Sequence, residues 1–485
     1  MKTSRFLTRV LILDLIYLIL VQCAVNPVTG EKELMLVSES QEIDMGKEFY
    51  PSALWGDLGG GGAFRDEQLH SYLRDIVLRI QAGSHRPNLP VDFAIQNSSI
   101  PNAWAIPGHV VITRGLLAGL ENEAEFVFVM GHEMGHVAAR HSARHMTYGM
   151  LQQVGLGAAG IALSGSDYAN LALGVGAVGS SLLLLKYGRD DELEADRLGI
   201  EYMARLGYDP QNALSAHRNL EKISGEYLKS VGKEAQEKGF FEDLLSTHPR
   251  TSVRIDELRV MINRMQPFKM AGDGTYRERY QTRTAGLRDT NSIYLEYYDS
   301  AARAYQKNNL DEAGSLIEKA LGKDHRQPAF HALKGFILLK RKDYAPAKSS
   351  FQTAMNIDKE YAPAYRGMGI LSYNQNNYRE GIDYLNWSLS LFPQDASSHY
   401  FLGMSYFRMN NYQSAIPHLK AFAEAQPKHP EVFGTLGICY EKSGDLSSAY
   451  QAYALQVRVA PDSEMGKHAA SRIAILKPAL QKQTR

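Results

Sequence analysis

The chain has 485 residues, with 53 lysines and arginines balanced by 53 aspartates and glutamates. Such a length suggests two to four domains, and the zero net charge gives no support to nucleic-acid or polyanion binding. Two cysteines in so long a chain exclude a disulfide scaffold.

Residues 1–23 are predicted to be an export signal. Basic residues near the start precede an apolar run of 12 residues at 10–21, which is too short for an ordinary membrane span. The run ends in Leu-Val-Gln-Cys, which resembles a bacterial lipobox except that Gln22 replaces a small residue. Two alternatives stay open for Cys23: acylation as the mature N-terminus, or a plain residue near a cleavage site.

The next segment predicts helices with short strands between them. Alternating apolar and polar residues at 91–96 are typical of a strand. The Pro107-Gly108 pair predicts a turn, and the β-branched run His109–Thr113 predicts a second strand after it. Asn102 begins the segment Asn-Ala-Trp-Ala-Ile-Pro-Gly, which ends in this turn.

The most informative stretch is His132-Glu133-Met134-Gly135-His136, an H-E-x-x-H pattern inside a helical segment. Residues four apart lie on one helix face, so His132 and His136 point the same way. Two imidazoles so placed can share one Zn²⁺. Glu133 lies beside them, where it can take a proton from a metal-bound water. The alternative is a chance pentapeptide, so the pattern needs a third ligand.

Two apolar runs, at 155–163 and 171–185, follow this helix. Each is shorter than a membrane-spanning helix and is rich in glycine. We expect a buried or interfacial helical hairpin, with peripheral membrane contact as the alternative.

A second helix is predicted from Asp190 onward. Glu192 and Asp196 are four apart and share a face, whereas Glu194 points away. Glu192 is the candidate third zinc ligand, and Asp196 would hold a ligand histidine by its free ring N–H. The alternative is a solvated acidic helix start, which the helix dipole also favours.

His248 lies in Ser246-Thr247-His248-Pro249, before a predicted helix that bears Arg254. Three roles are open for it: a hydrogen-bond donor to the oxyanion of the tetrahedral intermediate, a fourth zinc ligand that keeps the enzyme latent, or a loop residue. Arg254 and Asn102 are candidates for anchoring substrate or this loop, and a structural salt bridge is the alternative for Arg254.

These motifs together resemble the zincin metallopeptidases that include the CAAX-prenyl proteases. The resemblance covers roughly residues 26–265 and carries the H-E-M-G-H, E-L-E-A-D, N-A-W-A-I-P-G and S-T-H-P segments. It implies that Glu192 is the third ligand. In such proteases the strand matching His109–Thr113 borders the cleft and pairs with substrate backbone; a simple inner strand is the alternative. His109 departs from the family, which usually has a second glycine there.

A domain linker is predicted at 266–293, where apolar periodicity is weak. From 294 to 463 the chain repeats about five times, because four glycines recur at intervals of 34 residues, the tetratricopeptide period; they are Gly335, Gly369, Gly403 and Gly437. Such repeats stack into a solenoid with a concave face for extended segments. Residues 464–485 are predicted to be a capping helix and tail.

The predicted fold is mainly α: a signal at 1–23, a zincin-type α+β metalloprotease domain with a small sheet at 24–265, and an all-α repeat solenoid. The predicted activity is peptide-bond hydrolysis with one Zn²⁺ per chain. The resemblance implies a periplasmic quality-control protease, anchored to the outer membrane if Cys23 is acylated. Its clients would be unfolded or misassembled envelope proteins, and its repeats would contact clients or the outer-membrane assembly machinery. A repeat-based chaperone or scaffold with a latent or structural zinc site is the alternative.

Overall fold

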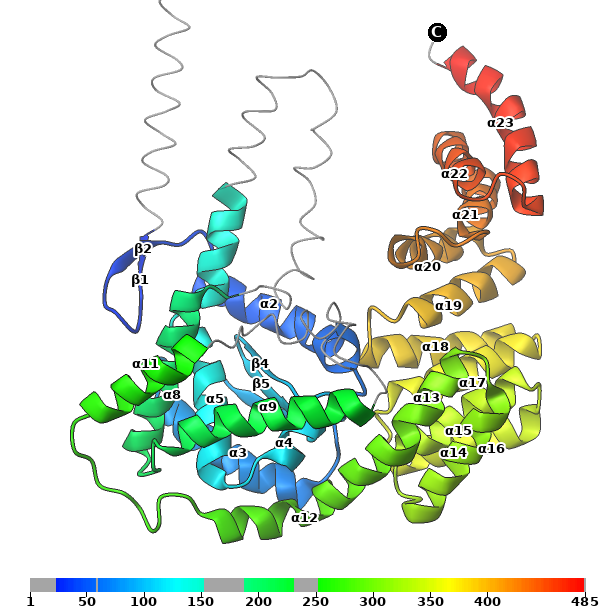
Figure 1. Ribbon diagram of the computed structural model, residues 1–485. Coiled ribbons are helices and arrows are strands. Elements are labelled where there is room, and N and C mark those ends of the chain that lie inside the picture. Colours follow the sequence, from blue (N-terminus) through cyan, green and yellow to red (C-terminus); the bar gives the residue numbers. More distant parts are fainter. Residues whose placement is uncertain (1–22, 58–59, 152–186, 231–251, 484–485) are drawn as a thin grey trace, which may run out of the picture. The chain divides into compact units, whose positions relative to one another are not determined.

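The computed structural model describes residues 23–57, 60–151, 187–230 and 252–483 (Figure 1). The chain divides into two compact units, Met1–Glu296 and Tyr297–Arg485. The predicted export signal before Cys23, and the apolar runs at 155–163 and 171–185, lie outside the described residues. Among the helices that the structure describes, none combines the length and apolar character needed to cross a lipid bilayer.

The first unit is an α+β arrangement of helices around a small sheet (Figure 1). Its elements are, in order, β1 (Cys23–Val25), β2 (Lys32–Leu34), α2 (Glu39–Ser52), η1 (Ala53–Asp57), α3 (Glu67–Ala82), β3 (Asp92–Gln96), β4 (Ala103–Ile106), β5 (His109–Thr113), α4 (Arg114–Gly119), α5 (Glu123–Ala138), α8 (Arg189–Arg205), α9 (Asn212–Ser230), α11 (Ser252–Arg264) and α12 (Arg277–Ile293).

The central sheet has the strand order β3-β5-β4. Strand β5 pairs in parallel with β3 and antiparallel with β4, so both of its edges are occupied. The expectation that substrate pairs with His109–Thr113 is therefore wrong, and the inner-strand alternative is right. The physical reason is the tight turn at Pro107-Gly108, which folds β4 back beside β5 and makes β4 the edge strand; Gly108 has φ 95° there.

Helices α5 and α8 approach closely because small residues face each other between them. A Cβ built on Gly131 would lie 3.2 Å from the Cα of Gly199, and one built on Gly135 would lie 3.2 Å from the Cα of Ala195. Larger residues at these positions would separate the helices. This contact brings the start of α8 beside the H-E-x-x-H segment of α5.

The segment 266–293, which was predicted to be the domain linker, holds helix α12 in its second half. Tyr280 and Leu287 of α12 belong to the same buried hydrophobic cluster as α3, the sheet and α5, and the Tyr280 hydroxyl donates to the Leu117 carbonyl at 2.8 Å. Its other two buried residues are the polar Thr284 and Thr290, which is why the sequence shows little apolar periodicity. Helix α12 therefore packs within the first unit.

The second unit is entirely helical where it is described (Figure 1). Its elements are α13 (Asp299–Gln306), α14 (Leu310–Lys323), α15 (Pro328–Lys340), α16 (Tyr344–Ile357), α17 (Ala362–Asn374), α18 (Tyr378–Leu391), α19 (Ala396–Arg408), α20 (Tyr412–Ala425), α21 (Val432–Lys442), α22 (Leu446–Val459) and the long final α23 (Glu464–Gln483). Consecutive helices pair, as tetratricopeptide repeats do.

The recurrent glycines are explained by a large side chain sixteen residues later in each repeat. A Cβ built on Gly403 would lie 2.7 Å from the Leu419 side chain, and one built on Gly437 would lie 2.4 Å from the ring of Tyr453. The first helix of each pair therefore needs a glycine so that the second can approach it. The turns repeat as well, since left-handed residues end successive first helices at the same period: Asn308, Lys342, Asn376, Asn410 and Gly444.

Candidate active site

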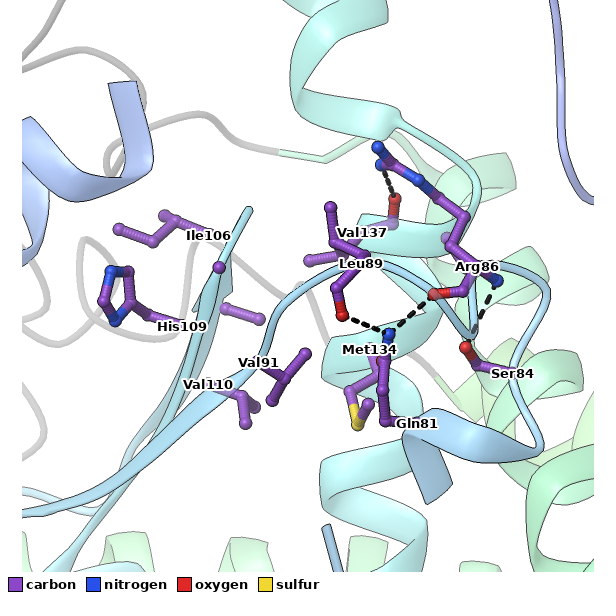
Figure 2. Close-up of a pocket in the computed structure, with 13 residues that line it drawn as sticks. Gln81, Ser84, Arg86, Leu89, Val91, Ile106, His109, Val110, Met134 and Val137 are labelled. Atoms are coloured by element: carbon purple, nitrogen blue, oxygen red, sulfur yellow. Dashed lines mark hydrogen bonds between the residues drawn. The ribbon is translucent and has the colours of Figure 1, made fainter. Parts of the chain in front are cut away.

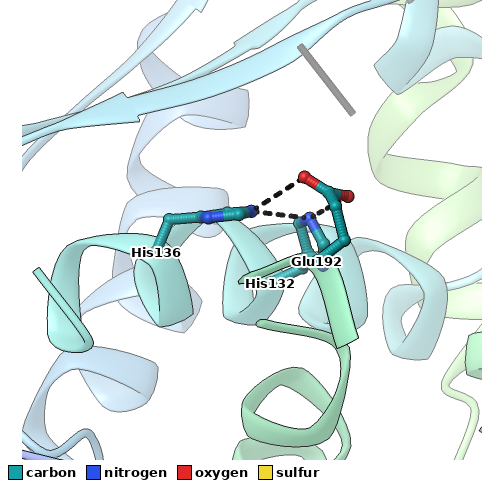
Figure 3. Close-up of side chains that lie close together, drawn as sticks. All are labelled: His132, His136 and Glu192. Atoms are coloured by element: carbon teal, nitrogen blue, oxygen red, sulfur yellow. Dashed lines mark hydrogen bonds and ion pairs between the residues drawn. The ribbon is translucent and has the colours of Figure 1, made fainter. Parts of the chain in front are cut away.

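Three side chains from two helices converge at the contact between α5 and α8 (Figure 3). The Nε2 atoms of His132 and His136 lie 3.2 Å apart. The Glu192 carboxylate lies 3.4 Å from Nε2 of His136 and 3.7 Å from Nε2 of His132. Ligands held about 2.0–2.2 Å from a tetrahedral zinc ion lie roughly 3.3–3.5 Å from one another. The spacing and the donor types therefore fit a zinc ion.

The three side chains are almost completely shielded from solvent, with His132 at 6%, His136 at 2% and Glu192 at 0% exposure. Burial holds the pKa of His136 well below its usual range, although the nearby Glu192 carboxylate opposes this effect. A neutral imidazole keeps the lone pair that a metal needs. His136 is therefore in a ligand-competent form at neutral pH.

Asp196 lies one turn after Glu192 on α8 and is fully buried. Its Oδ1 is 2.9 Å from Nδ1 of His132. Burial alone would raise the pKa of Asp196, but the charge of Arg254 and the contact with His132 hold it well below the usual range. An ionised Asp196 accepts the Nδ1 proton of His132 and leaves Nε2 directed at the metal position. This is the arrangement that the sequence predicted for Asp196.

Arg254 of α11 contacts both carboxylates of α8. Its Nε and Nη2 donate to Asp196 at 2.8 and 2.7 Å, and its Nη1 lies 2.5 Å from Oε2 of Glu192. Burial opposes the charge of Arg254, but the attraction of Asp196 and Glu192 raises its pKa. The side chain that was a candidate for binding substrate or a loop thus forms a buried ion-pair network, which corresponds to the salt-bridge alternative.

Glu133 is 5% exposed and lies on α5 between the two histidines. Its charge contributes to the field that raises the pKa of Arg254. It is therefore close to the same network.

The remaining sequence candidates lie elsewhere or outside the described residues. His248 falls in the segment 231–251, which is outside them. Asn102 pairs through its backbone with Thr113 at the end of the sheet, where its N–H donates to Oγ1 at 2.9 Å. Cys23 is the first residue of β1, which pairs with β2.

Two aromatic residues at the site were not predicted from the sequence. The ring of Tyr187 stacks on His136 with 3.9 Å between ring centroids. His217 of α9 lies 3.7 Å from Oδ1 of Asp196, and its ring lies beside Phe128. Burial lowers the pKa of His217, although the nearby carboxylate of Asp196 acts to raise it. No local pattern marks either residue, because each reaches the site only through contacts between segments that are far apart in the sequence.

A small pocket elsewhere on α5 is not the active site (Figure 2). It lies between the sheet and the α5 residues Met134 and Val137, which point away from the histidine face of the helix. Two of its polar side chains are engaged, since Gln81 donates to the Leu89 carbonyl at 2.9 Å and Arg86 donates to the Val137 carbonyl at 3.0 Å. Both ring nitrogens of His109, which also lines the pocket, are buried without a hydrogen-bond partner. The pocket is a packing gap behind the helix.

Comparisons with known proteins agree with the two-part organisation. The model of peptidase family M48 matches residues 65–262, and a tetratricopeptide-repeat model matches residues 406–473. Among solved structures, that of the MamA protein is similar to this chain over a match that covers 35% of this chain and 92% of MamA. The sequence identity is 21% and the TM-score is 0.29.

Two curated relatives are similar to this chain over more than half of its length. The beta-barrel assembly-enhancing protease of Yersinia pestis is 26% identical over 353 residues, which are 68% of this chain and 69% of that protein. The protein of the same name from Escherichia coli (strain K12) is 26% identical over 318 residues, which are 61% of this chain and 62% of that protein. The chain thus spans about two thirds of the length of these relatives.

Proposed function

Because the chain carries a peptidase family M48 domain followed by tetratricopeptide repeats, we propose that it is a zinc-dependent endopeptidase acting on misfolded or misassembled envelope proteins. The observation that carries the proposal is the convergence of His132, His136 and Glu192 at the mutual spacing of zinc ligands. Three protein ligands leave one position of a tetrahedral site for water or substrate, as in catalytic rather than structural zinc sites.

A zinc ion held by His132, His136 and Glu192 would supply a Lewis acid that lowers the pKa of a bound water to about 7. Glu133 would accept the proton of the attacking water and return it to the leaving amine. Asp196 would keep His132 in the tautomer that presents Nε2. His248 would either donate a hydrogen bond to the oxyanion or act as a fourth ligand that keeps the site latent.

We further propose that substrate backbone adds to β4 rather than to β5. Strand β4 is the edge of the sheet, and the Asn102 carbonyl accepts from the Thr113 N–H at 2.9 Å. Backbone groups alternate in direction along an antiparallel pair, so those of Ala103 and Ala105 point away from β5. Ala103 is buried, whereas Ala105 is only partly buried, so the backbone groups of Ala105 are the ones that we propose for pairing with an added strand. Such pairing reads an extended chain independently of sequence.

The repeats would recruit clients or partners, and the outer-membrane assembly machinery is the partner that we propose. The name of both relatives, beta-barrel assembly-enhancing protease, supports this choice. We place the protein in the periplasm, with Cys23 as the proposed lipid attachment site.

A chaperone or scaffold with a latent zinc site is the second candidate. The near-complete burial of the three ligand side chains favours it, since substrate needs access to the metal. Under this alternative the repeats alone would carry the function.

The variant Glu133→Gln, measured in the purified full chain, distinguishes the two proposed functions. The endopeptidase proposal expects one zinc per chain in both proteins, cleavage of a loosely folded casein by the wild type, and a loss of roughly 10²–10⁴-fold in the variant. Removal of the metal with a chelator should abolish cleavage, and added Zn²⁺ should restore it. If Glu133→Gln supports assembly of envelope proteins in cells as well as the wild type does, that result would instead support the scaffold.

A further inference from the structure

A third histidine, His141, contacts one of the proposed metal ligands. Nδ1 of His136 lies 2.8 Å from Nδ1 of His141, and Nε2 of His141 lies 3.1 Å from Oε2 of Glu194. We propose that His141 is a positioning residue that orients His136 toward the metal, and that Glu194 fixes the orientation of His141. This inference rests on the proposed metal site at His132, His136 and Glu192.

The proton positions follow from the series of three side chains, His136, His141 and Glu194. If Nε2 of His136 binds a metal, its only proton is on Nδ1, which must then donate. His141 can accept at Nδ1 only if its own proton is on Nε2, and that proton donates to Glu194. Every donor in this series faces an acceptor. The same series prevents His141 from being a metal ligand through Nδ1, because that lone pair accepts from His136.

The backbone is shaped to bring His141 onto His136. Helix α5 ends at Ala138, and Arg140 adopts the left-handed conformation with φ 57°, which a non-glycine residue rarely takes. Buried contacts hold it there: Nε donates to Glu42 at 3.2 Å and Nη2 donates to the Val37 carbonyl at 2.8 Å. The chain therefore changes direction after α5, and the fully buried His141 lies against His136.

The two metal-binding histidines are thus supported differently. His132 donates to the carboxylate of Asp196, whereas His136 is backed by a second imidazole and only then by a carboxylate. Helix α8 supplies all three acids: Glu192 to the metal position, Asp196 to His132, and Glu194 to His141. Glu194 lies on the other side of α8 from Glu192, yet the returning chain brings His141 within its reach.

The test is the zinc dissociation constant of the purified full chain, measured by competition with a chromogenic chelator. Loss of a group that orients a ligand typically weakens metal binding by about 10–100-fold. We expect His141→Ala to fall in that range and Glu194→Ala to give a smaller loss. Glu194→Gln keeps an acceptor oxygen and should recover most of the affinity of Glu194→Ala. Thermal unfolding of the metal-free variants shows that each is folded.

A matched control is His145→Ala. His145 lies one turn after His141, and its Nε2 contacts Asp191 at 2.7 Å rather than a metal ligand. It should bind zinc as the wild type does. Equal weakening by His141→Ala and His145→Ala, or wild-type affinity in His141→Ala, would overturn the inference.

The absorption spectrum of the Co²⁺-loaded protein distinguishes positioning from ligation. We expect His141→Ala to keep the four-coordinate band intensity with a small shift in wavelength. A changed coordination number would make His141 a ligand and reject the inference. Failure of the wild type to bind one metal per chain would refute the proposed function itself, so the two failures are distinguishable.

Discussion

Arg254 Nη1 lies 2.5 Å from Oε2 of Glu192, so a buried guanidinium contacts the same carboxylate that completes the proposed metal site. Arg254 also holds Asp196 through two nitrogens. One cation therefore neutralises two carboxylates that are both 0% exposed, and it connects α11 to α8 at the site.

Arg254→Ala should destabilise the metal-free protein by about 3–5 kcal/mol, because it leaves two buried carboxylates without their cation. Bound zinc supplies positive charge at Glu192, so saturating zinc should stabilise this variant more than it stabilises the wild type. Unfolding in urea with and without zinc measures both effects. The exposed pair of Arg259 and Asp256 on the same helix supplies the control, since Arg259→Ala should change stability by less than about 1 kcal/mol.

Ala105→Pro should impair substrate binding if extended chain adds to β4. The Ala105 N–H points away from β5, so proline removes the donor offered to substrate and keeps the existing ladder, as edge strands tolerate. We expect a higher KM for casein cleavage with zinc content unchanged. Ala105→Val, which keeps the N–H, should behave nearly as the wild type. An unchanged KM in Ala105→Pro would argue against strand addition at this edge.

Gly403→Ala should destabilise the repeats, although a glycine-to-alanine change in a helix normally stabilises by roughly 0.5–1 kcal/mol. The new Cβ would lie 2.7 Å from the Leu419 side chain and 3.1 Å from its backbone nitrogen, and overpacking of this kind costs about 1–3 kcal/mol. The control is Gly322→Ala in α14, where a Cβ meets nothing within 4 Å. Chemical denaturation should give opposite signs for the two variants.

The repeats should lose stability as the pH falls from about 6.5 toward 4. Nδ1 of His399 and Nδ1 of His418 lie 3.1 Å apart, and burial together with His399 lowers the pKa of His418 from 6.5 to about 4. Between these values the unfolded chain binds a proton that the folded chain does not, so protonation favours unfolding. Stability is therefore full above pH 6.5 and is lost toward pH 4.

His418→Gln removes this titration and should flatten the dependence of unfolding free energy on pH across that window. His331→Gln, at a histidine that hydrogen-bonds the His325 carbonyl in another repeat, should keep the wild-type profile. Identical pH profiles of the wild type and His418→Gln would show that this pair does not control acid stability.

Strand order was not predictable from the alternation of apolar residues. The runs 91–96 and His109–Thr113 both indicated strands, and both are strands. Which strand lies at the edge depends on pairing between segments, and the Pro107-Gly108 turn places β4 there. Helix α12 was likewise not predicted, because the apolar periodicity of 266–293 is weak. Its few apolar residues are buried only by packing against α4 and α5.

The sequence by itself determined the features that repeat within one helical turn or one structural repeat. Spacing of four residues placed His132 with His136 and Glu192 with Asp196, and spacing of 34 residues marked the repeats. Only the tertiary structure decided how α5 meets α8, that Arg254 holds the acids of α8, and that His141 turns back onto His136. The reason is that backbone geometry fixes the direction of side chains over a few residues, whereas contacts between distant segments depend on packing, such as the close approach at Gly131 and Gly135.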